Sequence, residues 1–207
     1  MHFRPIETVL LRRAAQRYAA HGWDVMPGAA FNGERHRCDD PGCPTFGCHP
    51  ALEGWTDAAS RDSSLVVTWW HRNPYTVLLP TGREFDVLEL PTRLGVVVAR
   101  GPIPAPVAVT GTGSYLIFVS PGDPLRPELA RSVDVVLHGR HSWVAAPPSR
   151  ELAGRVRWEV SPEEVGWQLP DSYAVQRLLV DLQAAMAPTR PTRLQVQRLI
   201  EQVHRAA

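Results

Sequence analysis

The chain has 207 residues, and all 22 of its Lys+Arg residues are arginine. With 44% hydrophobic residues, 21% charged residues and a net charge of +1, the composition indicates a folded protein and excludes a disordered chain or a nucleic-acid binder that depends on bulk positive charge. The sequence shows neither the roughly 20 consecutive apolar residues of a membrane span nor an apolar signal-peptide core, so we expect no membrane contact and a cytoplasmic protein.

Helical periodicity and turn residues predict the N-terminal elements. Apolar residues recur at helical spacing over residues 7–20, and Gly22 can end that helix in a left-handed conformation. A short strand is predicted over residues 23–26. The Gly-, Pro-, Cys- and His-rich residues 29–55 are predicted as a loop, which is long for a compact domain and needs an internal organiser. A second helix is predicted over residues 62–73.

Short apolar runs separated by Gly or Pro predict a sheet in the middle of the chain. The predicted strands are 75–79, 85–90, 107–110, 115–119, 133–137, 142–146 and 155–160. A helix is predicted over residues 90–98. Residues 115–119 and 133–137 are so apolar that we expect both strands at the centre of the sheet.

The C-terminal part is predicted to be helical. Residues 170–187 form an amphipathic pattern, and residues 192–207 form a second one with arginines along its polar side. Strands grouped between helices, with no βαβ alternation, indicate an α+β class with a mostly antiparallel central sheet and flanking helices.

Five potential metal ligands crowd into the predicted loop, and the rest of the chain contains no cysteine. They are His36, Cys38, Cys43, Cys48 and His49. Three cysteines in a reducing compartment are poor material for disulfides, whereas thiolates and imidazoles suit a structural Zn²⁺. Cys38 and Cys43 are the strongest candidates. The neighbours Cys48 and His49 do not easily bind the same ion, so the choice of four ligands among the five stays open.

A series of short motifs, read in order over residues 10–160, resembles one known family. The motifs are His21-Gly22-Trp23, Val25-Met26-Pro27, the Cys/His loop, Gly54-Trp55, Asp57-Ala58, Trp69-Trp70, Asn73-Pro74, Thr81-Gly82, Thr110-Gly111-Thr112-Gly113, Asp134 and Val144-Ala145-Ala146-Pro147-Pro148-Ser149. In this order they are similar to the N-terminal domain of actinobacterial bifunctional DNA primase/polymerases, in the archaeo-eukaryotic primase superfamily.

The resemblance implies a ligand set for the zinc loop. Family members often carry ligands at the positions of His36, Cys38, Cys43 and His49, and these four are therefore the implied set. Cys48 falls where the family often has lysine and remains the rival ligand.

The resemblance also implies a two-metal site for nucleotidyl transfer, which this chain matches incompletely. The family's paired strand acids fall on Glu89 and Pro91, and its histidine falls on Tyr115. Asp134 is the counterpart of the third acid, although the turn after it is two residues longer than usual. Glu89 and Asp134 alone are a weak ligand set for Mg²⁺ or Mn²⁺ with a triphosphate, so the sequence predicts a degenerate active site.

A Gly-rich turn is the candidate nucleotide-binding element, because backbone N–H groups in such turns can hold phosphate. It comprises Thr110, Gly111, Thr112, Gly113 and the following Tyr115.

These observations predict a primase–polymerase-like domain over residues 1–168, with a zinc loop at 36–49, and a helical appendage over 169–207. The predicted function is that of a catalytically degenerate accessory or regulatory module in DNA replication, which binds nucleotide or DNA weakly or binds a protein through its C-terminal helices. The alternatives are an active DNA primase/polymerase with Mg²⁺ or Mn²⁺ and a protein-interaction scaffold with a filled cleft. The degenerate site favours a protein that is not an enzyme.

Overall fold

The structure is a computed structural model that describes residues 5–40 and 42–186. The predicted helix over residues 192–207 lies outside these residues. Among the helices formed by the described residues, none combines the length and the apolar character needed to cross a bilayer.

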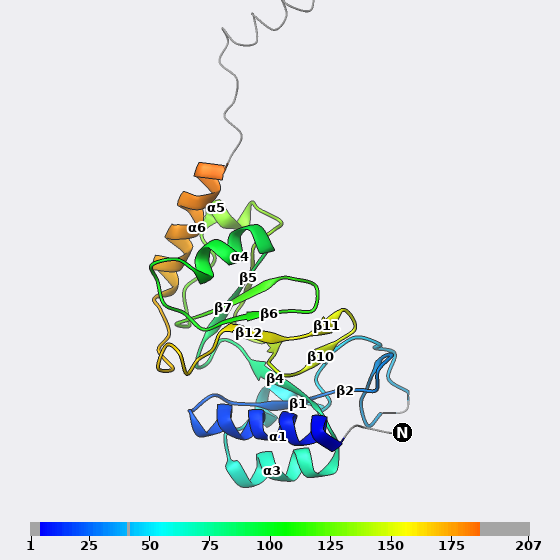
Figure 1. The fold of residues 1–207 in the computed structure, drawn as a ribbon. Helices are drawn as coiled ribbons and strands as arrows, with labels where there is room; N and C mark the ends of the chain where they lie inside the picture. The colour runs from blue at the N-terminus through cyan, green and yellow to red at the C-terminus, as the bar shows by residue number, and fades with distance from the viewer. Residues whose placement is uncertain (1–4, 41, 187–207) are drawn as a thin grey trace, which may run out of the picture.

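Apart from the short helix α2, the helices gather in two groups at opposite ends of the molecule (Figure 1). In chain order they are α1 (Pro5–Ala20), α2 (Trp55–Ala58), α3 (Ser63–Arg72), α4 (Thr92–Ala99), α5 (Pro127–Ala130) and α6 (Ser172–Met186). Helices α1 and α3 lie together at one end, and α4, α5 and α6 lie at the other. The strands occupy the space between the two groups.

The strands form two main antiparallel sheets and two small hairpins. The strands are β1 (Met26–Gly28), β2 (Ala30–Phe31), β3 (His36–Arg37), β4 (Thr76–Pro80), β5 (Asp86–Leu90), β6 (Val107–Val109), β7 (Tyr115–Val119), β8 (Val136–His138), β9 (Trp143–Ala145), β10 (Arg150–Glu151), β11 (Gly154–Arg155) and β12 (Arg157–Val160). A three-stranded sheet has the order β1-β4-β9, and a five-stranded sheet has the order β12-β6-β7-β5-β8. Strand pairs β2-β3 and β10-β11 are the hairpins.

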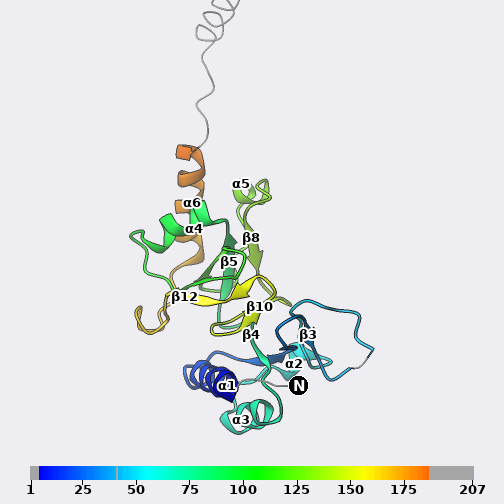
Figure 2. The ribbon, with the colours of Figure 1, turned by 45° about the vertical axis from the view of Figure 1, so that its right-hand side comes forward.

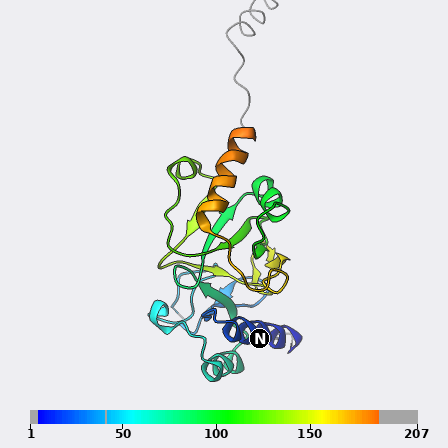
Figure 3. The same ribbon diagram turned by 90° about the vertical axis from the view of Figure 1, so that its left-hand side faces the viewer.

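Two hydrophobic cores cover both faces of the five-stranded sheet. The first core lies between α1, α3 and the two sheets, and the largest of its fully buried side chains is Trp70. The second core lies between the five-stranded sheet and the group α4, α5 and α6. Figures 2 and 3 show the ribbons of this sheet and these helices from two further sides. Strand β5 serves both cores because its side chains alternate: Val87 belongs to the first, and Leu88 and Leu90 belong to the second.

The structure confirms the α+β class and most of the predicted elements. The first predicted helix corresponds to α1, which ends at Ala20, and Gly22 just after it has a left-handed φ of 86°. Helix α3 matches the second prediction, and the side chain of Asp62 caps it by accepting hydrogen bonds from the backbone N–H groups of Ser64 and Leu65.

Three predictions about elements are wrong. The strand expected over residues 23–26 runs over Met26–Gly28, because these residues pair with β4. The expected loop contains the β2-β3 hairpin. The strand expected at the sheet centre over residues 133–137 is the edge strand β8, and Val133 outside it is 96% exposed. Apolar content alone does not distinguish an edge strand from a central one, because position in a sheet depends on pairing.

Helix α6 begins just after the predicted domain boundary at residue 168. It contributes Val175 and Leu179 to the second core, and both side chains are fully buried. The boundary stays a prediction, but this helix packs as a part of the domain core.

Gly95 allows α4 to lie directly on the five-stranded sheet. A Cβ atom added at Gly95 would lie 2.2 Å from the Cβ and Cγ atoms of Tyr115 on β7, so only glycine fits between the helix and the ring. The close contact holds Tyr115 in the second core, where it is 6% exposed.

We expect Gly95→Ala to lower the free energy of unfolding by about 1–3 kcal/mol, because the added methyl group overpacks the contact with Tyr115. Urea unfolding measures the loss. Val97→Ala on the same helix is the matched control: Val97 is 42% exposed, and its substitution should change stability much less. Equal losses from the two variants would contradict the packing argument.

Candidate functional site

A cavity of about 540 Å³ lies between the two main sheets. Polar side chains from several elements line it, together with an apolar floor that includes Leu116 and Val144. The polar lining residues are His36, Cys48, Glu89, Thr110, Thr112, His138, Ser142 and Glu151. The cavity therefore collects one of the two predicted catalytic acids, two residues of the Gly-rich turn and two of the five predicted metal ligands.

Glu89 enters the cavity because of the alternation of β5. It pairs with Leu116 of β7 and Val136 of β8, on the face of the sheet that turns away from α4. Its Oε2 atom lies 2.9 Å from Nε2 of His138. The hydrogen bond from His138 holds the pKa of Glu89 below its usual range, against the opposing effect of partial burial.

Asp134 does not join Glu89 among the lining residues of the cavity. It lies in a turn before β8, its side chain is 43% exposed, and it forms an ion pair with Arg93 at the start of α4. In the described part of the chain, neither acid belongs to a group of three or more His, Cys, Asp or Glu ligand atoms within 4.8 Å of one another. The two predicted catalytic acids are therefore separately paired.

The Gly-rich turn contributes to the cavity through side chains. Thr110 and Thr112 line it, and their hydroxyl oxygens lie 2.7 Å apart. The backbone N–H groups of Gly113 and Ser114 are used inside the turn, where they donate to Thr110. This leaves fewer free N–H groups for phosphate than the sequence suggests.

Tyr115, predicted beside the nucleotide, points to the other face of the sheet. It pairs with Leu90, shares the second core with it and packs against α4. The alternation of β7 thus separates Tyr115 from Glu89, and Tyr115 does not fill the cavity.

Glu151 is a cavity residue that the sequence analysis missed. It lies on β10, and its burial raises the pKa of its carboxyl group, with a smaller contribution from the charge of Glu89. An isolated glutamate on a two-residue strand belongs to no recognisable motif. Glu151 reaches the cavity because the β10-β11 hairpin folds against it, which the local sequence does not show.

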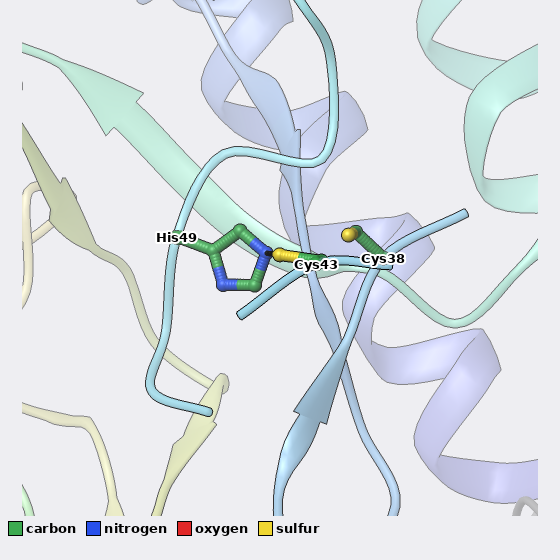
Figure 4. A group of neighbouring side chains, drawn as sticks. All are labelled: Cys38, Cys43 and His49. Atoms are coloured by element: carbon green, nitrogen blue, oxygen red, sulfur yellow. Dashed lines mark hydrogen bonds between the residues drawn. The ribbon is translucent and has the colours of Figure 1, made fainter. Parts of the chain in front are cut away.

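Three of the five predicted metal ligands come together at the edge of the loop (Figure 4). The ligand atoms of Cys38, Cys43 and His49 all lie within 4.8 Å of one another, so the cluster can bind a metal ion. Nδ1 of His49 lies 2.8 Å from the carbonyl oxygen of Gly47. That contact leaves Nε2 facing Sγ of Cys43 at 3.4 Å, as a ligand nitrogen held by a backbone carbonyl should.

The other two predicted ligands lie differently. Cys48 lines the inter-sheet cavity and packs on the first core, where burial raises the pKa of its thiol to about 12. His36 is 2% exposed, and its Nε2 lies 3.1 Å from the carbonyl oxygen of Arg150. Within the described residues, its Nδ1 is buried without a hydrogen-bond partner. A buried nitrogen of this kind is suited to a metal ion.

We expect Glu89→Gln to lower the free energy of unfolding at pH 7 by less than about 1 kcal/mol, because the pair with His138 is partly exposed. The pKa of Glu89 is lower in the folded chain, so its ionised form stabilises the fold above its unfolded pKa of about 4.3. That contribution is lost as the pH falls through the folded pKa. Urea unfolding at pH 7 and pH 3 should therefore show a smaller difference from the wild type at pH 3 than at pH 7.

Glu34→Gln at an exposed position is the matched control and should leave stability unchanged at both values of pH. A loss in Glu89→Gln that persists undiminished at pH 3 would show that the carboxylate charge is not its cause.

A comparison with family models matches residues 15–172, well over half of the chain, to the family described as bifunctional DNA primase/polymerase, N-terminal. A comparison with curated proteins found no match.

Proposed function

Since the chain belongs to the family of bifunctional DNA primase/polymerase N-terminal domains, we propose that it is a non-polymerising member that binds nucleotide or single-stranded nucleic acid in the inter-sheet cavity. In this role it serves DNA replication as an accessory module. The family supports nucleotide or nucleic acid as the class of ligand, and the inter-sheet cavity supports the position of the binding site.

The observation that carries the proposal is the separate pairing of the two expected metal-binding acids. Glu89 is hydrogen-bonded to His138, and Asp134 is paired with Arg93 outside the cavity lining. Two-metal nucleotidyl transfer needs several carboxylates around the same ions. Pro91 and Tyr115 add no ligand to Glu89, since one is uncharged and the other faces the second core.

The cavity suits a nucleotide base. Its volume of about 540 Å³ lies within the usual range for small-molecule sites. Trp143 on β9 supplies an aromatic ring to the lining, and Thr110 and Thr112 supply hydroxyl groups. Aromatic rings bind bases by stacking with little dependence on sequence.

A second candidate function is active primase/polymerase chemistry, and Glu151 is the observation that favours it. Glu89 and Glu151 line the same cavity, and the charge of Glu89 contributes to the raised pKa of Glu151, as expected for neighbouring carboxylates. In this candidate the two glutamates hold Mg²⁺ or Mn²⁺ and replace the acid pair expected at Glu89 and Pro91.

A protein partner at the C-terminal helices stays a third prediction, since residues 192–207 lie outside the described part.

Primer extension distinguishes the first two candidates. We expect the wild-type protein to extend no primer with Mg²⁺ or Mn²⁺, because the ligand set is incomplete. Extension that is lost in both Glu89→Ala and Glu151→Ala, and retained in Asp134→Ala, would establish the second candidate. Extension that is lost in Asp134→Ala would instead restore the predicted pair of acids.

Tryptophan fluorescence tests the binding part of the same proposal. Titration with a nucleoside triphosphate or a single-stranded oligonucleotide should quench emission in a saturable manner. The quenching should be lost in Trp143→Phe and kept in the control Trp69→Phe, because Trp69 does not line the cavity. The absence of binding by both probes would leave the protein-scaffold function.

The metal cluster is proposed to bind a structural Zn²⁺ ion. Two thiolates and an imidazole are ligands that Zn²⁺ prefers, and they lie in a loop with little core of its own. We propose His36 as the fourth ligand, because its buried Nδ1 has no hydrogen-bond partner in the described chain. Its Nε2–H can donate to the carbonyl oxygen of Arg150. Cys48 is the less suitable rival, since its thiol packs on the first core.

We expect about one zinc ion per chain of purified protein, measured by elemental mass spectrometry. Cys43→Ala should lose the ion, because it removes a thiolate from the cluster, and the matched control Cys48→Ala should keep it. A zinc content near zero in the wild type would contradict the metal assignment, and loss of zinc in Cys48→Ala alone would make Cys48 the ligand.

A further inference from the structure

Three polar side chains form a hydrogen-bonded chain along the wall of the inter-sheet cavity. Nε2 of His138 lies 2.9 Å from Oε2 of Glu89, and Nδ1 of the same ring lies 3.1 Å from Oγ of Ser142. All three residues line the cavity. When the Nε2 proton is donated to the carboxylate, Nδ1 is left to accept the hydroxyl proton of Ser142.

The turn that joins β8 to β9 is held rigidly at both ends by Thr81. The hydroxyl of Thr81 donates to the carbonyl oxygen of Gly139 at 2.6 Å, and its backbone N–H donates to the carbonyl oxygen of Ser142 at 3.0 Å. Gly82, with φ 84°, packs so closely on the turn that an added Cβ would lie 2.4 Å from Cα of Arg140. The fixed turn therefore holds both His138 and Ser142 in place.

The residue before Ser142 is in a strained conformation. His141 has a φ of 61°, which is uncommon for a residue other than glycine. Such strain persists where the surrounding structure enforces it, and it gathers at functional sites. Here the enforcing contacts are those of Thr81 and Gly82.

We propose that this cavity cleaves uncharged carboxylic esters, with Ser142 as nucleophile, His138 as general base and Glu89 as the residue that positions the imidazole. The arrangement of hydroxyl, imidazole and carboxylate is the one by which a serine is activated. This activity goes beyond the proposed binding of nucleotide or nucleic acid and does not depend on it.

The reaction runs in two steps. Oγ of Ser142 forms a bond to the ester carbonyl carbon as its proton passes to Nδ1 of His138, and the bond to the alcohol oxygen then breaks as His138 returns that proton to the leaving alcohol. In the second step water attacks the acyl-serine, His138 takes a proton from the water, and the carboxylic acid leaves as Ser142 regains its proton. Glu89 stabilises the charged imidazole in both steps.

The charge of the cavity indicates the substrate class. Two carboxylates, Glu89 and Glu151, line it, and none of the described lining residues is an arginine. This lining offers no cation to stabilise the charge that develops on a phosphate ester during its cleavage. The apolar side chains of Leu116, Val144 and Leu152 line the same cavity and suit an uncharged acyl group.

Covalent labelling tests the nucleophile. A fluorophosphonate probe should label the full-length protein, and mass spectrometry of the digested adduct should place the label on Ser142. With p-nitrophenyl acetate the wild type should show a burst of about one nitrophenolate per chain, followed by slow turnover. An absent label, or a label on another residue, overturns the proposal.

Variants test the roles of the three residues. Ser142→Ala should lose the label and the burst, His138→Gln should slow labelling about 100-fold, and Glu89→Gln should slow it by about tenfold. Ser132→Ala, in the turn before β8, is the control and should react like the wild type.

A merely structural role would give a different pattern. If Glu89 and His138 only support the turn, their variants will unfold more easily but label at the wild-type rate, and this result overturns the proposal. The position of the label on the wild-type chain tests the nucleophile even if Ser142→Ala fails to fold. If the wild-type protein is labelled but binds neither nucleotide nor oligonucleotide, the proposed function is refuted and the esterase proposal stands.

Discussion

The burial of both faces of strand β5 is the constraint on which the rest of the structure depends. The strand lies between β7 and β8, and one side of the sheet packs against α4 and α6 while the other faces α1, α3 and the second sheet. A central strand covered on both faces must be apolar at nearly every position. The exceptions are Asp86 and Glu89. Asp86 begins the strand and accepts a hydrogen bond from the backbone N–H of Gly122, whereas Glu89 lies where the first core opens into the cavity. The carboxylate of Glu89 can stay ionised there, because His138 donates a hydrogen bond to it.

The same alternation determines which side chains lie on the side of β5 that carries Glu89. Residues two apart share a face of a strand, so Val87 shares the face of Glu89, where it belongs to the first core. Pro91 follows the strand as the residue before α4. Neither carries a charge. The histidine-equivalent position, Tyr115, is on the opposite face and fills the space above Gly95. The carboxylate that accompanies Glu89 in the cavity is Glu151, which comes from a hairpin about 60 residues further along the chain.

The metal loop and the cavity are neighbours through His36. Its Nε2 contacts Arg150, the residue before Glu151, and its ring lines the cavity while the adjacent Cys38 belongs to the metal cluster. A metal ion bound by His36 and the cluster would therefore brace the β10-β11 hairpin as well as its own loop. Such an ion would link the order of the loop to the position of a cavity residue, since side chains that bind a metal ion lose most of their rotational freedom.

The sequence by itself determined the features that depend on neighbours in the chain. The limits of α1 and α3 follow from apolar spacing, from Gly22 and from the cap at Asp62, and the cluster of Cys38, Cys43 and His49 follows from ligands only 11 residues apart at most. The family was recognisable from motifs in order. Only the tertiary structure decided that β8 lies at a sheet edge, that Cys48 turns from the metal cluster to the core, and that Glu89, His138 and Ser142 meet. The physical reason is that strand pairing and side-chain direction depend on which distant segments pack together, and local residue patterns do not contain that information.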